Sequence, residues 1–205
     1  MKQVEGWWIP ETDEARHPVK RRMKKSRVID IALLYARDRG TCIQAGGHLG
    51  YWPLRLAAKF ERVVTFEPEP GNFACLARNC AGRANIEPRR SALGAAPGRV
   101  ALVHTPASTG THHVDPAAAG GDCPLETIDA LDLAPAAIFL DIEGLELAAL
   151  EGAEHTIRRY RPLVVIEENR CLERYGHAAG DCARFLARYG YVEKTRYSHD
   201  IIYGC

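Results

Sequence analysis

Residues 41–67 read TCIQAGGHLGYWPLRLAAKFERVVTFE, and this stretch predicts the fold. Thr41–Ala45 has the pattern of a short buried strand, and the glycines that follow it favour a tight turn. Tyr51–Phe60 then carries apolar residues at helical spacing, and Val63–Phe66 is a second short apolar run. A strand, a glycine turn, a helix and a second strand in this order are typical of a mainly parallel sheet covered by helices on both faces.

The alternation continues along the chain, apart from residues 105–124, which are rich in Gly, Ala, Pro and Thr and predict a long loop. A loop of that length in a compact domain is usually functional or mobile. The sequence therefore predicts an α/β protein with a doubly wound, mainly parallel sheet. The other predicted helices are Arg27–Arg37, Asn72–Cys80, the segment with the apolar stripe Leu147, Leu150, Ala153 and Ile157, and Asp181–Tyr189; the other predicted strands are Asn85–Arg90, Arg99–His104, Ala137–Leu140, Leu163–Ile166 and a C-terminal hairpin of Tyr191–Thr195 with Ile201–Tyr203.

The composition is that of one globular domain, or of one domain with an appended arm. The chain has 205 residues, 46% of them hydrophobic and 26% charged, and a formal net charge of +1. This balance argues against a protein whose main task is to coat nucleic acid. The apolar runs are too short to span a bilayer, the N-terminus lacks a signal-peptide core, and the seven cysteines show no CxxC spacing. We therefore expect reduced, mostly buried thiols and a cytoplasmic protein.

Residues 1–27 differ from the rest and are predicted to form an N-terminal arm, followed by a single domain over residues 28–205. Trp7 and Trp8 form an apolar knot, and a basic run extends from Lys20 to Arg27. The basic run has two interpretations: contact with phosphate groups, or a solvated face leading into the first helix. The tryptophan pair is expected to cap the core or a pocket rather than to stack on bases.

Four predicted strands end in glycine-rich or polar segments. Ligands of doubly wound sheets bind beyond the carboxyl ends of the strands, so these segments are expected to lie together. In Gln44–Gly50, glycines allow the backbone to approach a ligand, and the helix start offers free N–H groups to an anionic group. Glu67 lies about 20 residues after this loop, the spacing at which a carboxylate accepts the hydroxyl protons of a ribose. The other two segments are Arg90–Gly94, whose small residues suit an adenine ring, and Asp141–Glu146, which places acids at the expected reacting end of the ligand.

These segments also carry a family resemblance. Gly46–Tyr51, Phe66–Pro70, Ser91–Gly94, Asp141–Glu146 and Leu150–Ala153 together resemble the FkbM-type methyltransferases, which belong to the class I S-adenosylmethionine-dependent group. The resemblance covers roughly residues 41–170. It implies a Rossmann-like sheet of seven strands with an antiparallel last hairpin. It also implies S-adenosylmethionine as the methyl donor and an acceptor hydroxyl group, often on a sugar or a natural product.

The resemblance also implies roles for particular residues. It places Ala45, Gly46, Gly47 and Gly50 at the methionine part of the cofactor and Glu67 at the ribose; we call the segment Gln44–Gly50 the glycine loop. Ser91 and Ala92 match the edge of the adenine, while Asp141 and Glu143 match the acids beside the transferred methyl group.

The sequence departs from the usual family pattern at two positions. Gln44 stands where an acid is common, and His48 stands where Asn is common. Gln44 removes a carboxylate partner for the ammonium group of the cofactor, although it still offers an acceptor. The full set of candidate cofactor-binding residues is Gln44, Ala45, Gly46, Gly47, His48, Leu49, Gly50, Tyr51, Glu67, Pro68, Asn72, Arg90, Ser91, Ala92 and Asp141.

Methyl transfer to an alcohol needs an aligned acceptor, exclusion of bulk water and a group that takes the hydroxyl proton. The candidate catalytic residues are Asp141 and Glu143 after the fourth strand of the predicted sheet, and His112 or His113 in the long loop, which would have to fold over the site. The alternative for the histidines is that both are ordinary loop residues.

A bound Mg²⁺ ion is a further way to acidify the hydroxyl group. Asp141, Glu168 and Asn169 follow two neighbouring strands and resemble the acidic and Asn positions of magnesium-dependent methyltransferases of the catechol type. Oxygen ligands of this kind suit Mg²⁺. The alternative is that the acids after the fifth strand only line the rim of the pocket.

Three functions are therefore open. The first is an S-adenosylmethionine-dependent O-methyltransferase for a small molecule, a sugar or a glycan. The second is a methyltransferase for a nucleotide or nucleic acid, motivated by the basic run, although the Asn/Asp-Pro-Pro-Tyr/Phe signature of amino-group DNA methylation is missing after the fourth strand. The third is a non-catalytic binding module, motivated by Gln44. No membrane partner is expected. Few residues remain for recognising the acceptor, so we expect that a second subunit completes the pocket.

Overall fold

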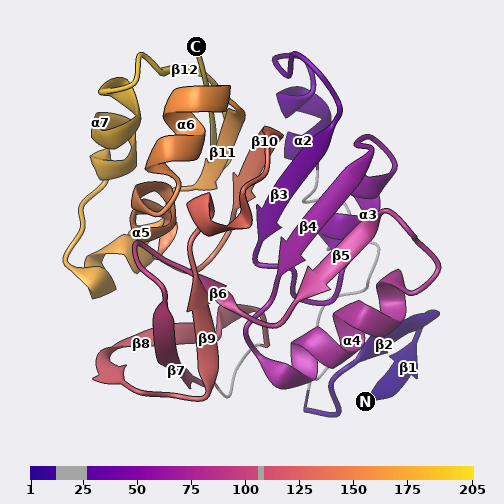
Figure 1. Cartoon of the computed structure of the whole chain (residues 1–205). Helices are drawn as coiled ribbons and strands as arrows, with labels where there is room; N and C mark the ends of the chain where they lie inside the picture. The colour runs from indigo at the N-terminus through magenta and orange to yellow at the C-terminus, as the bar shows by residue number, and fades with distance from the viewer. Residues whose placement is uncertain (13–26, 106–108) are drawn as a thin grey trace.

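The fold is built on one large central sheet. The computed structural model describes residues 1–12, 27–105 and 109–205, with the backbone alone at 116–119. The central sheet has seven strands in the order β12-β13-β11-β10-β3-β4-β5 (Figure 1). These strands are β3 (Thr41–Ala45), β4 (Arg62–Phe66), β5 (Ile86–Arg89), β10 (Pro135–Leu140), β11 (Leu163–Glu167), β12 (Val192–Tyr197) and β13 (Asp200–Gly204).

The sheet is parallel except for β13. Strand β3 pairs in parallel with both β4 and β10, whereas β13 runs antiparallel to its two neighbours, β11 and β12. The chain passes from β3 to β4 and β5 on one side and then returns to β10 and β11 on the other, so the strand order reverses between β3 and β10. This confirms the predicted doubly wound, mainly parallel sheet and its antiparallel C-terminal hairpin.

Helices cover both faces of the sheet. Ile43 and Val64 face α5, α6 and α7, whereas Cys42 and Val63 face α2, α3 and α4. Because successive side chains of a strand point to opposite faces, a strand buried on both faces is apolar along its whole length. The short apolar runs of the sequence have this cause. The helices are α2 (Arg27–Ala32), α3 (Tyr51–Ala57), α4 (Pro70–Cys80), α5 (Glu146–Glu151), α6 (Glu154–Tyr160) and α7 (Asp181–Ala187), with the short 3₁₀ helices η2 (Asp129–Leu131) and η3 (Arg170–Tyr175).

The prediction of a long loop over residues 105–124 was wrong. A second sheet, with the strand order β6-β9-β7-β8, includes part of this stretch and lies below the central sheet in Figure 1. The stretch is rich in Thr, Pro, Ala and Gly and shows no alternation of polar and apolar residues, so its pairing with β7 has no local signal. The elements are β6 (Ala92–Leu93), β7 (Gly98–Val103), η1 (Thr109–Thr111), β8 (His113–Ala119) and β9 (Cys123–Glu126).

Helices α3 and α7 end three and two residues earlier than predicted, and two other predicted helices differ more. Helix α2 stops early because the Arg39 guanidinium donates to the carbonyls of Leu33 and Ala36, which a continuing helix would use. The predicted helix with the apolar stripe is divided into α5 and α6 at Gly152. A Cβ on Gly152 would lie 2.1 Å from the Gly94 carbonyl oxygen, so this point of the chain packs directly on another segment.

The N-terminal arm contains a hairpin that the sequence did not predict. Strand β1 (Lys2–Val4) pairs antiparallel with β2 (Trp7–Ile9), and β2 packs on α4. Asn79 of α4 holds the hairpin as a strand partner would. Its Oδ1 accepts the Trp8 N–H at 2.9 Å, and its Nδ2 donates to the carbonyls of Trp8 at 2.9 Å and Leu49 at 2.8 Å.

Most of the predicted basic run, from Lys20 to Lys25, lies outside the described residues. Arg27, at its end, begins α2. Within the parts of the chain that the structure describes, no helix has the length and apolar character needed to cross a membrane.

Replacing Asn79 by Ala is expected to lower the free energy of unfolding by about 2–3 kcal/mol, because three hydrogen bonds are lost and their part-buried backbone partners remain. The measurement is urea denaturation at neutral pH. Arg83→Ala, an exposed position after the same helix, is the control and should change the free energy by less than about 0.5 kcal/mol. Equal stability of the Asn79→Ala variant and the wild type would contradict the role of Asn79.

Candidate functional site

A cavity of about 450 Å³ lies beyond the carboxyl ends of β3, β4, β10 and β11, at the point where the strand order reverses. Its volume is in the range typical of small-molecule sites. Its walls come from the loop after β3, the residues that follow β4 and β10, strand β6 and the segment Thr109–Val114. Among the described residues, no Lys or Arg lines it.

The glycine loop is pressed against the ends of two strands. The N–H groups of Gly46 and Gly47 both donate to the Phe66 carbonyl, at 3.1 and 2.8 Å. Gly46 has φ +85°, and a Cβ on it would lie 1.9 Å from the Asp141 carbonyl oxygen, so only glycine has room there. His48 has φ +46°, a left-handed conformation that is uncommon for residues other than glycine. Strained residues of this kind cluster at ligand sites.

Glu67 lines the cavity from a buried position directly after β4, with 6% of its surface exposed. Its Oε2 accepts the His48 N–H at 2.7 Å, and its Oε1 accepts the Glu69 N–H at 3.0 Å. Burial raises the pKa of Glu67 from 4.5 to about 7, against the opposing effect of these donors and of the Asn72 side chain. Each carboxylate oxygen has a second lone pair, so the group is able to accept hydroxyl protons from a ligand as well.

Acidic side chains form another wall of the cavity. The carboxyl groups of Asp141, after β10, and Glu167, at the end of β11, lie next to each other, and burial together with Glu167 raises the pKa of Asp141 well above its usual range. Glu143 also lines the cavity, and burial raises its pKa. The loop that carries Asp141 and Glu143 is held by Glu146, whose Oε1 accepts the Ile142 N–H at 2.9 Å. Such a wall favours a cationic or hydrogen-bond-donating group over an anion.

The segment Thr109–Val114 lines the cavity on a further side, and we call it the roof. The Thr109 Oγ1 lies 3.0 Å from His48 Nε2, and the Thr109 carbonyl accepts from Asn72 Nδ2 at 2.8 Å. At the other end, the Val114 carbonyl accepts from the Tyr175 hydroxyl at 2.8 Å. The roof is therefore fastened to the glycine loop, to α4 and to η3.

The two roof histidines have different hydrogen-bond partners, which define different neutral tautomers. The Nδ1 of His112 accepts the Thr105 N–H at 3.1 Å, so the neutral ring carries its proton on Nε2; burial lowers the pKa of His112. The Nδ1 of His113 lies 3.3 Å from the Thr111 carbonyl, which only accepts. The neutral His113 ring therefore carries its proton on Nδ1, and its Nε2 is the nitrogen with a lone pair.

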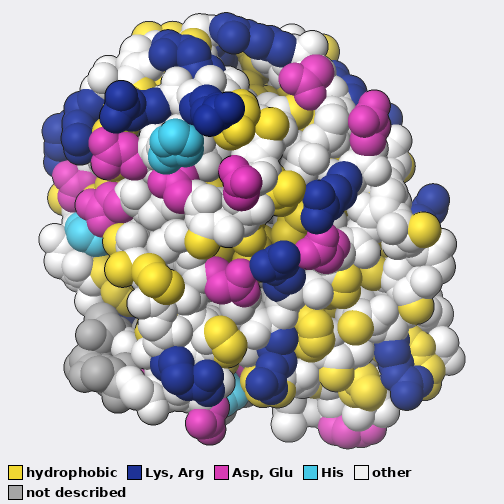
Figure 2. All heavy atoms as spheres, viewed as in Figure 1, with side chains coloured by type: hydrophobic (Ala, Val, Ile, Leu, Met, Phe, Trp, Pro, Cys, Tyr) yellow, Lys and Arg dark blue, Asp and Glu magenta, His cyan; other side chains and the backbone are white. Residues whose placement is uncertain are grey.

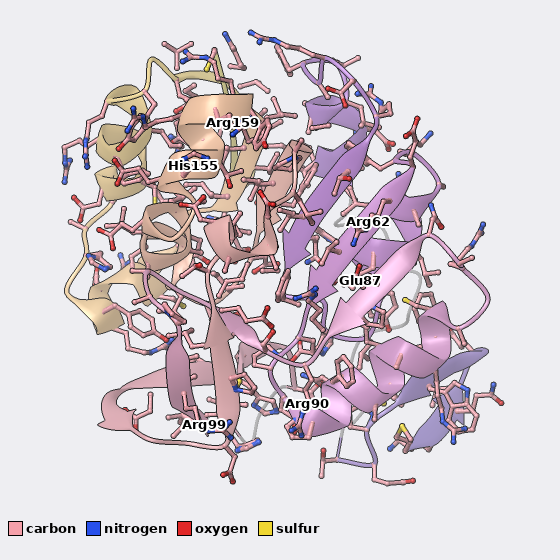
Figure 3. All side chains as sticks on the ribbon, viewed as in Figure 1. Arg62, Glu87, Arg90, Arg99, His155 and Arg159 are labelled. Carbon is pink, nitrogen blue, oxygen red and sulfur yellow. The ribbon has the colours of Figure 1, made fainter. Side chains whose placement is uncertain are left out.

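The structure brings most of the predicted site residues to this one cavity, but not all. Gln44 lies behind the wall: it is fully buried, its Oε1 accepts from Thr65 Oγ1 at 2.5 Å, and its Nε2 donates to the Ala45 carbonyl. Leu49 and Gly50 also do not line the cavity, and Arg90 is exposed beyond the end of β5 (Figure 3). The predicted residues that line the cavity are Ala45, Gly46, Gly47, His48, Tyr51, Glu67, Pro68, Asn72, Ser91, Ala92, His112, His113, Asp141 and Glu143.

The predicted magnesium ligands do not converge. The Oε2 of Glu168 accepts the Gly180 N–H at 3.2 Å. The Oδ1 of Asn169 accepts the Cys171 N–H at 2.8 Å, and its Nδ2 donates to Glu167, so this side chain caps η3. Over residues 1–12, 27–105 and 109–205, no group of three His, Cys, Asp or Glu side chains is arranged to hold a metal ion. The magnesium site is not supported.

Several lining residues were not assigned to the site from the sequence. Glu167 had a usable signal, because it is the last residue of a strand that ends at the same edge as β10. Trp52 follows Tyr51 in α3, and its helical position predicts burial but no cavity. Four others lie in segments that the sequence analysis singled out, but they were not themselves assigned to the site: Phe66, Leu93, Ile142 and Leu145. The remaining four have no sequence signal, since their place depends on the roof: Thr109, Gly110, Thr111 and Val114.

Stability is expected to fall as the pH rises from about 5 to about 7.5. Burial raises the pKa of both Glu67 and Glu146 from 4.5 to about 7, so between these values the unfolded chain loses protons that the folded chain keeps. Each group then lowers the free energy of unfolding by about 3 kcal/mol once the pH exceeds 7. Asp141 acts in the same direction, and His112, whose pKa is lowered, in the opposite one. Urea denaturation at several pH values is the measurement.

Glu146→Gln is the matched variant for this pH series, because it removes one of the two titrations without reaching the cavity lining. Its stability should depend on pH less steeply than that of the wild type. A wild-type stability that rises between pH 5 and 7.5, or an unchanged slope in Glu146→Gln, would contradict the assignment.

Comparison of the sequence with family models and of the structure with solved structures both find methyltransferases. Residues 44–193 match the model of the methyltransferase FkbM domain. The crystal structure of methyltransferase FkbM from Methylobacillus flagellatus is similar, with a TM-score of 0.56 and 21% identity over 82% of this chain and 44% of that one. This chain therefore spans less than half the length of that protein. No protein of curated function matches the sequence.

Two further crystal structures share the fold. Streptococcus pneumoniae Sp1610, in complex with S-adenosyl-L-methionine, has a TM-score of 0.53 and 11% identity over 87% of this chain and 72% of that one. The N-methyltransferase NodS from Bradyrhizobium japonicum has a TM-score of 0.50 and 12% identity over 93% of this chain and 96% of that one. At this level of identity the similarity is one of fold.

Proposed function

Because this chain belongs to the FkbM methyltransferase family, we propose that it transfers a methyl group from S-adenosyl-L-methionine to a hydroxyl group of a small molecule, a sugar or a glycan. The observation that carries this proposal is the contact between Glu67 and the glycine loop. The Glu67 carboxyl, our candidate ribose ligand directly after β4, accepts the N–H of His48, so the two proposed cofactor-binding elements are joined within one cavity.

Acceptor groups in the cavity support this proposal. Glu67 suits the two hydroxyl groups of a ribose, and Ser91 and Ala92 provide a narrow edge for the adenine. The wall of Asp141, Glu143 and Glu167 suits the ammonium and sulfonium groups and takes over the partner role that Gln44 cannot fill. When bound, the cofactor supplies an electrophilic methyl group on a positively charged sulfur.

The chain itself has to orient the acceptor hydroxyl and to receive its proton. We assign the proton to His113, because its Nε2 is the basic nitrogen of the neutral ring and its Nδ1 is already held by the Thr111 carbonyl. His112 would have to give up its hydrogen bond from Thr105 to take a proton on Nδ1, so we assign it a donor role. Asp141 and Glu143 hold positive charge beside the reacting carbon and remain the alternative acceptors of the proton.

A titration of the purified protein with S-adenosylhomocysteine tests the cofactor proposal, with NAD⁺ as a control dinucleotide. We expect S-adenosylhomocysteine to bind with a micromolar Kd and NAD⁺ not to bind. Labelled S-adenosylmethionine, offered with sugars, glycans and hydroxylated small molecules, then tests the transfer. Lack of S-adenosylhomocysteine binding would refute the proposal, and binding without transfer to any acceptor in this panel or in a lysate would favour a non-catalytic module.

Nothing in the cavity favours a nucleic-acid acceptor. The carboxylates that line it repel phosphate groups, and most of the basic run lies outside the described residues. On the face shown in Figure 2, Lys and Arg side chains are interspersed with Asp and Glu, and part of this mixture is the ion pair of Arg62 with Glu87 labelled in Figure 3. We therefore propose only the small-molecule or glycan acceptor.

A further inference from the structure

Asn72 occupies an unusual position in the cavity wall. It lies in the first turn of α4, its side chain is 2% exposed, and its backbone N–H is capped by Glu69. The Nδ2 donates to the Thr109 carbonyl of the roof at 2.8 Å, and the side chain lies beside the Glu67 carboxyl, whose pKa it lowers. Both groups accept, so the nitrogen of the amide has to face them and the oxygen has to face away.

The Asn72 oxygen lacks a donor among the residues that the structure describes. Among the described residues, no donor reaches Oδ1, although the side chain lines the cavity and is almost completely buried. Buried amide oxygens in folded proteins nearly always have a donor, and one that lacks a donor destabilises the conformation that buries it. Because Oδ1 is itself covered, a donor from a ligand reaches it only when the groups around it shift, and the arrangement of the roof over Asn72 is incomplete until that happens.

We propose that Asn72 accepts a hydrogen bond from a ribose hydroxyl of the bound cofactor, and that this bond stabilises the position of the roof. The inference rests on the proposed function and adds to it the order of binding. A ribose hydroxyl is the expected donor because Asn72 touches Glu67, the residue placed for the ribose. When Oδ1 accepts from this hydroxyl, the amide is fixed in the one orientation in which Nδ2 holds Thr109.

The connection from Asn72 to the reaction is short. Thr109 begins the 3₁₀ turn Thr109–Thr111. His113, which we assign as the proton acceptor, follows this turn after one further residue. Thr109 is also tied to the glycine loop through His48. Asn72 and His48, at the nucleoside end of the site, therefore hold the roof. The roof also carries His113, the proton acceptor at the other end of the site. Asn72 acts as a positioning residue, and the cofactor binds before the acceptor.

A double cycle on protein and ligand tests the contact. S-adenosylhomocysteine and its 2′-deoxy and 3′-deoxy analogues are titrated into the wild type and into Asn72→Ala. The analogue that lacks the hydroxyl bound by Asn72 should bind the wild type about 10-fold more weakly than S-adenosylhomocysteine does. For Asn72→Ala the difference between the two ligands should be less than about 3-fold. Equal losses in both proteins, for both analogues, would overturn the proposal. Asn85→Ala, whose amide bonds the Ala57 and Phe60 carbonyls outside the cavity, is the control and should behave as the wild type.

Hydrogen exchange of residues 109–114 tests the effect on the roof. S-adenosylhomocysteine should slow the exchange of these amides in the wild type. The deoxy analogue that lacks the hydroxyl bound by Asn72 should leave their exchange unchanged, even at saturation. This comparison uses the wild type alone, so it holds even if Asn72→Ala does not fold. Roof protection by the deoxy analogue equal to that by S-adenosylhomocysteine would overturn the proposal. Failure of the wild type to bind S-adenosylhomocysteine would refute the proposed function instead.

Discussion

Replacing Glu67 by Gln is expected to weaken the binding of S-adenosylhomocysteine by at least about 100-fold. Two ribose hydroxyls that donate to a carboxylate contribute together about 3–6 kcal/mol, and tenfold in affinity is about 1.4 kcal/mol. The amide also disturbs the glycine loop itself, because both carboxylate oxygens already accept a backbone N–H, from His48 and Glu69. A Gln side chain must point its NH₂ group at one of these donors, so the glycine loop loses a contact that orients it.

The pH dependence of binding separates this explanation from general damage. Burial raises the pKa of Glu67 to about 7, and donation by two hydroxyl groups favours the ionised form. The affinity of the wild type should therefore rise between pH 6 and pH 8, and that of Glu67→Gln should rise less, because only the titration of the other carboxyl groups in the cavity remains. Glu87→Gln, which breaks an exposed ion pair with Arg62 outside the cavity, is the control and should bind as the wild type does. A Glu67→Gln affinity within threefold of the wild type would exclude Glu67 as the ribose ligand.

The central sheet was predictable because its signal is local. Strands buried on both faces produce continuous apolar runs, and Ala137–Leu140 and Leu163–Ile166 are such runs. The positions of Gly46 and Glu67 were predictable for the same reason, since each directly follows a strand whose end can be found from the sequence. Once the strands are parallel and their order reverses, the topology alone places these residues at one edge.

Gln44 shows where this reasoning ends. Its place in the motif indicates contact with a ligand, but in the structure its side chain bonds to a residue of the neighbouring strand. Gln44 pairs in register with Thr65 of β4, and the two buried side chains hydrogen-bond to each other. The register between two strands cannot be predicted from the sequence of either strand alone. The roof is a second example, because Thr109 is held by His48 and Asn72, which are distant in sequence.

Replacing Gly46 by Ala is expected to lower the melting temperature by at least about 8 °C, or to prevent soluble expression. The positive φ of +85° destabilises any residue with a Cβ by about 1–2 kcal/mol. The new Cβ also meets backbone, 1.9 Å from the Asp141 carbonyl oxygen, and relief requires the ends of β3 and β10 to separate although Asp141 N–H donates to the Ala45 carbonyl there. We expect a total of about 4 kcal/mol or more, at about 2–4 °C per kcal/mol for a domain of this size.

The three glycines Gly46, Gly47 and Gly82 should rank by what each new Cβ meets. At Gly47 the Cβ would approach the Leu76 and Thr65 side chains, at 2.4 and 2.8 Å, and Leu76 is able to move while the backbone keeps its place. At Gly82 it would meet nothing within 4 Å. The loss of melting temperature should therefore be largest for Gly46→Ala, smaller for Gly47→Ala and close to zero for Gly82→Ala. A Gly46→Ala variant as stable as Gly82→Ala would show that the glycine loop does not have to lie against β10, and the site built on that contact would have to be rejected.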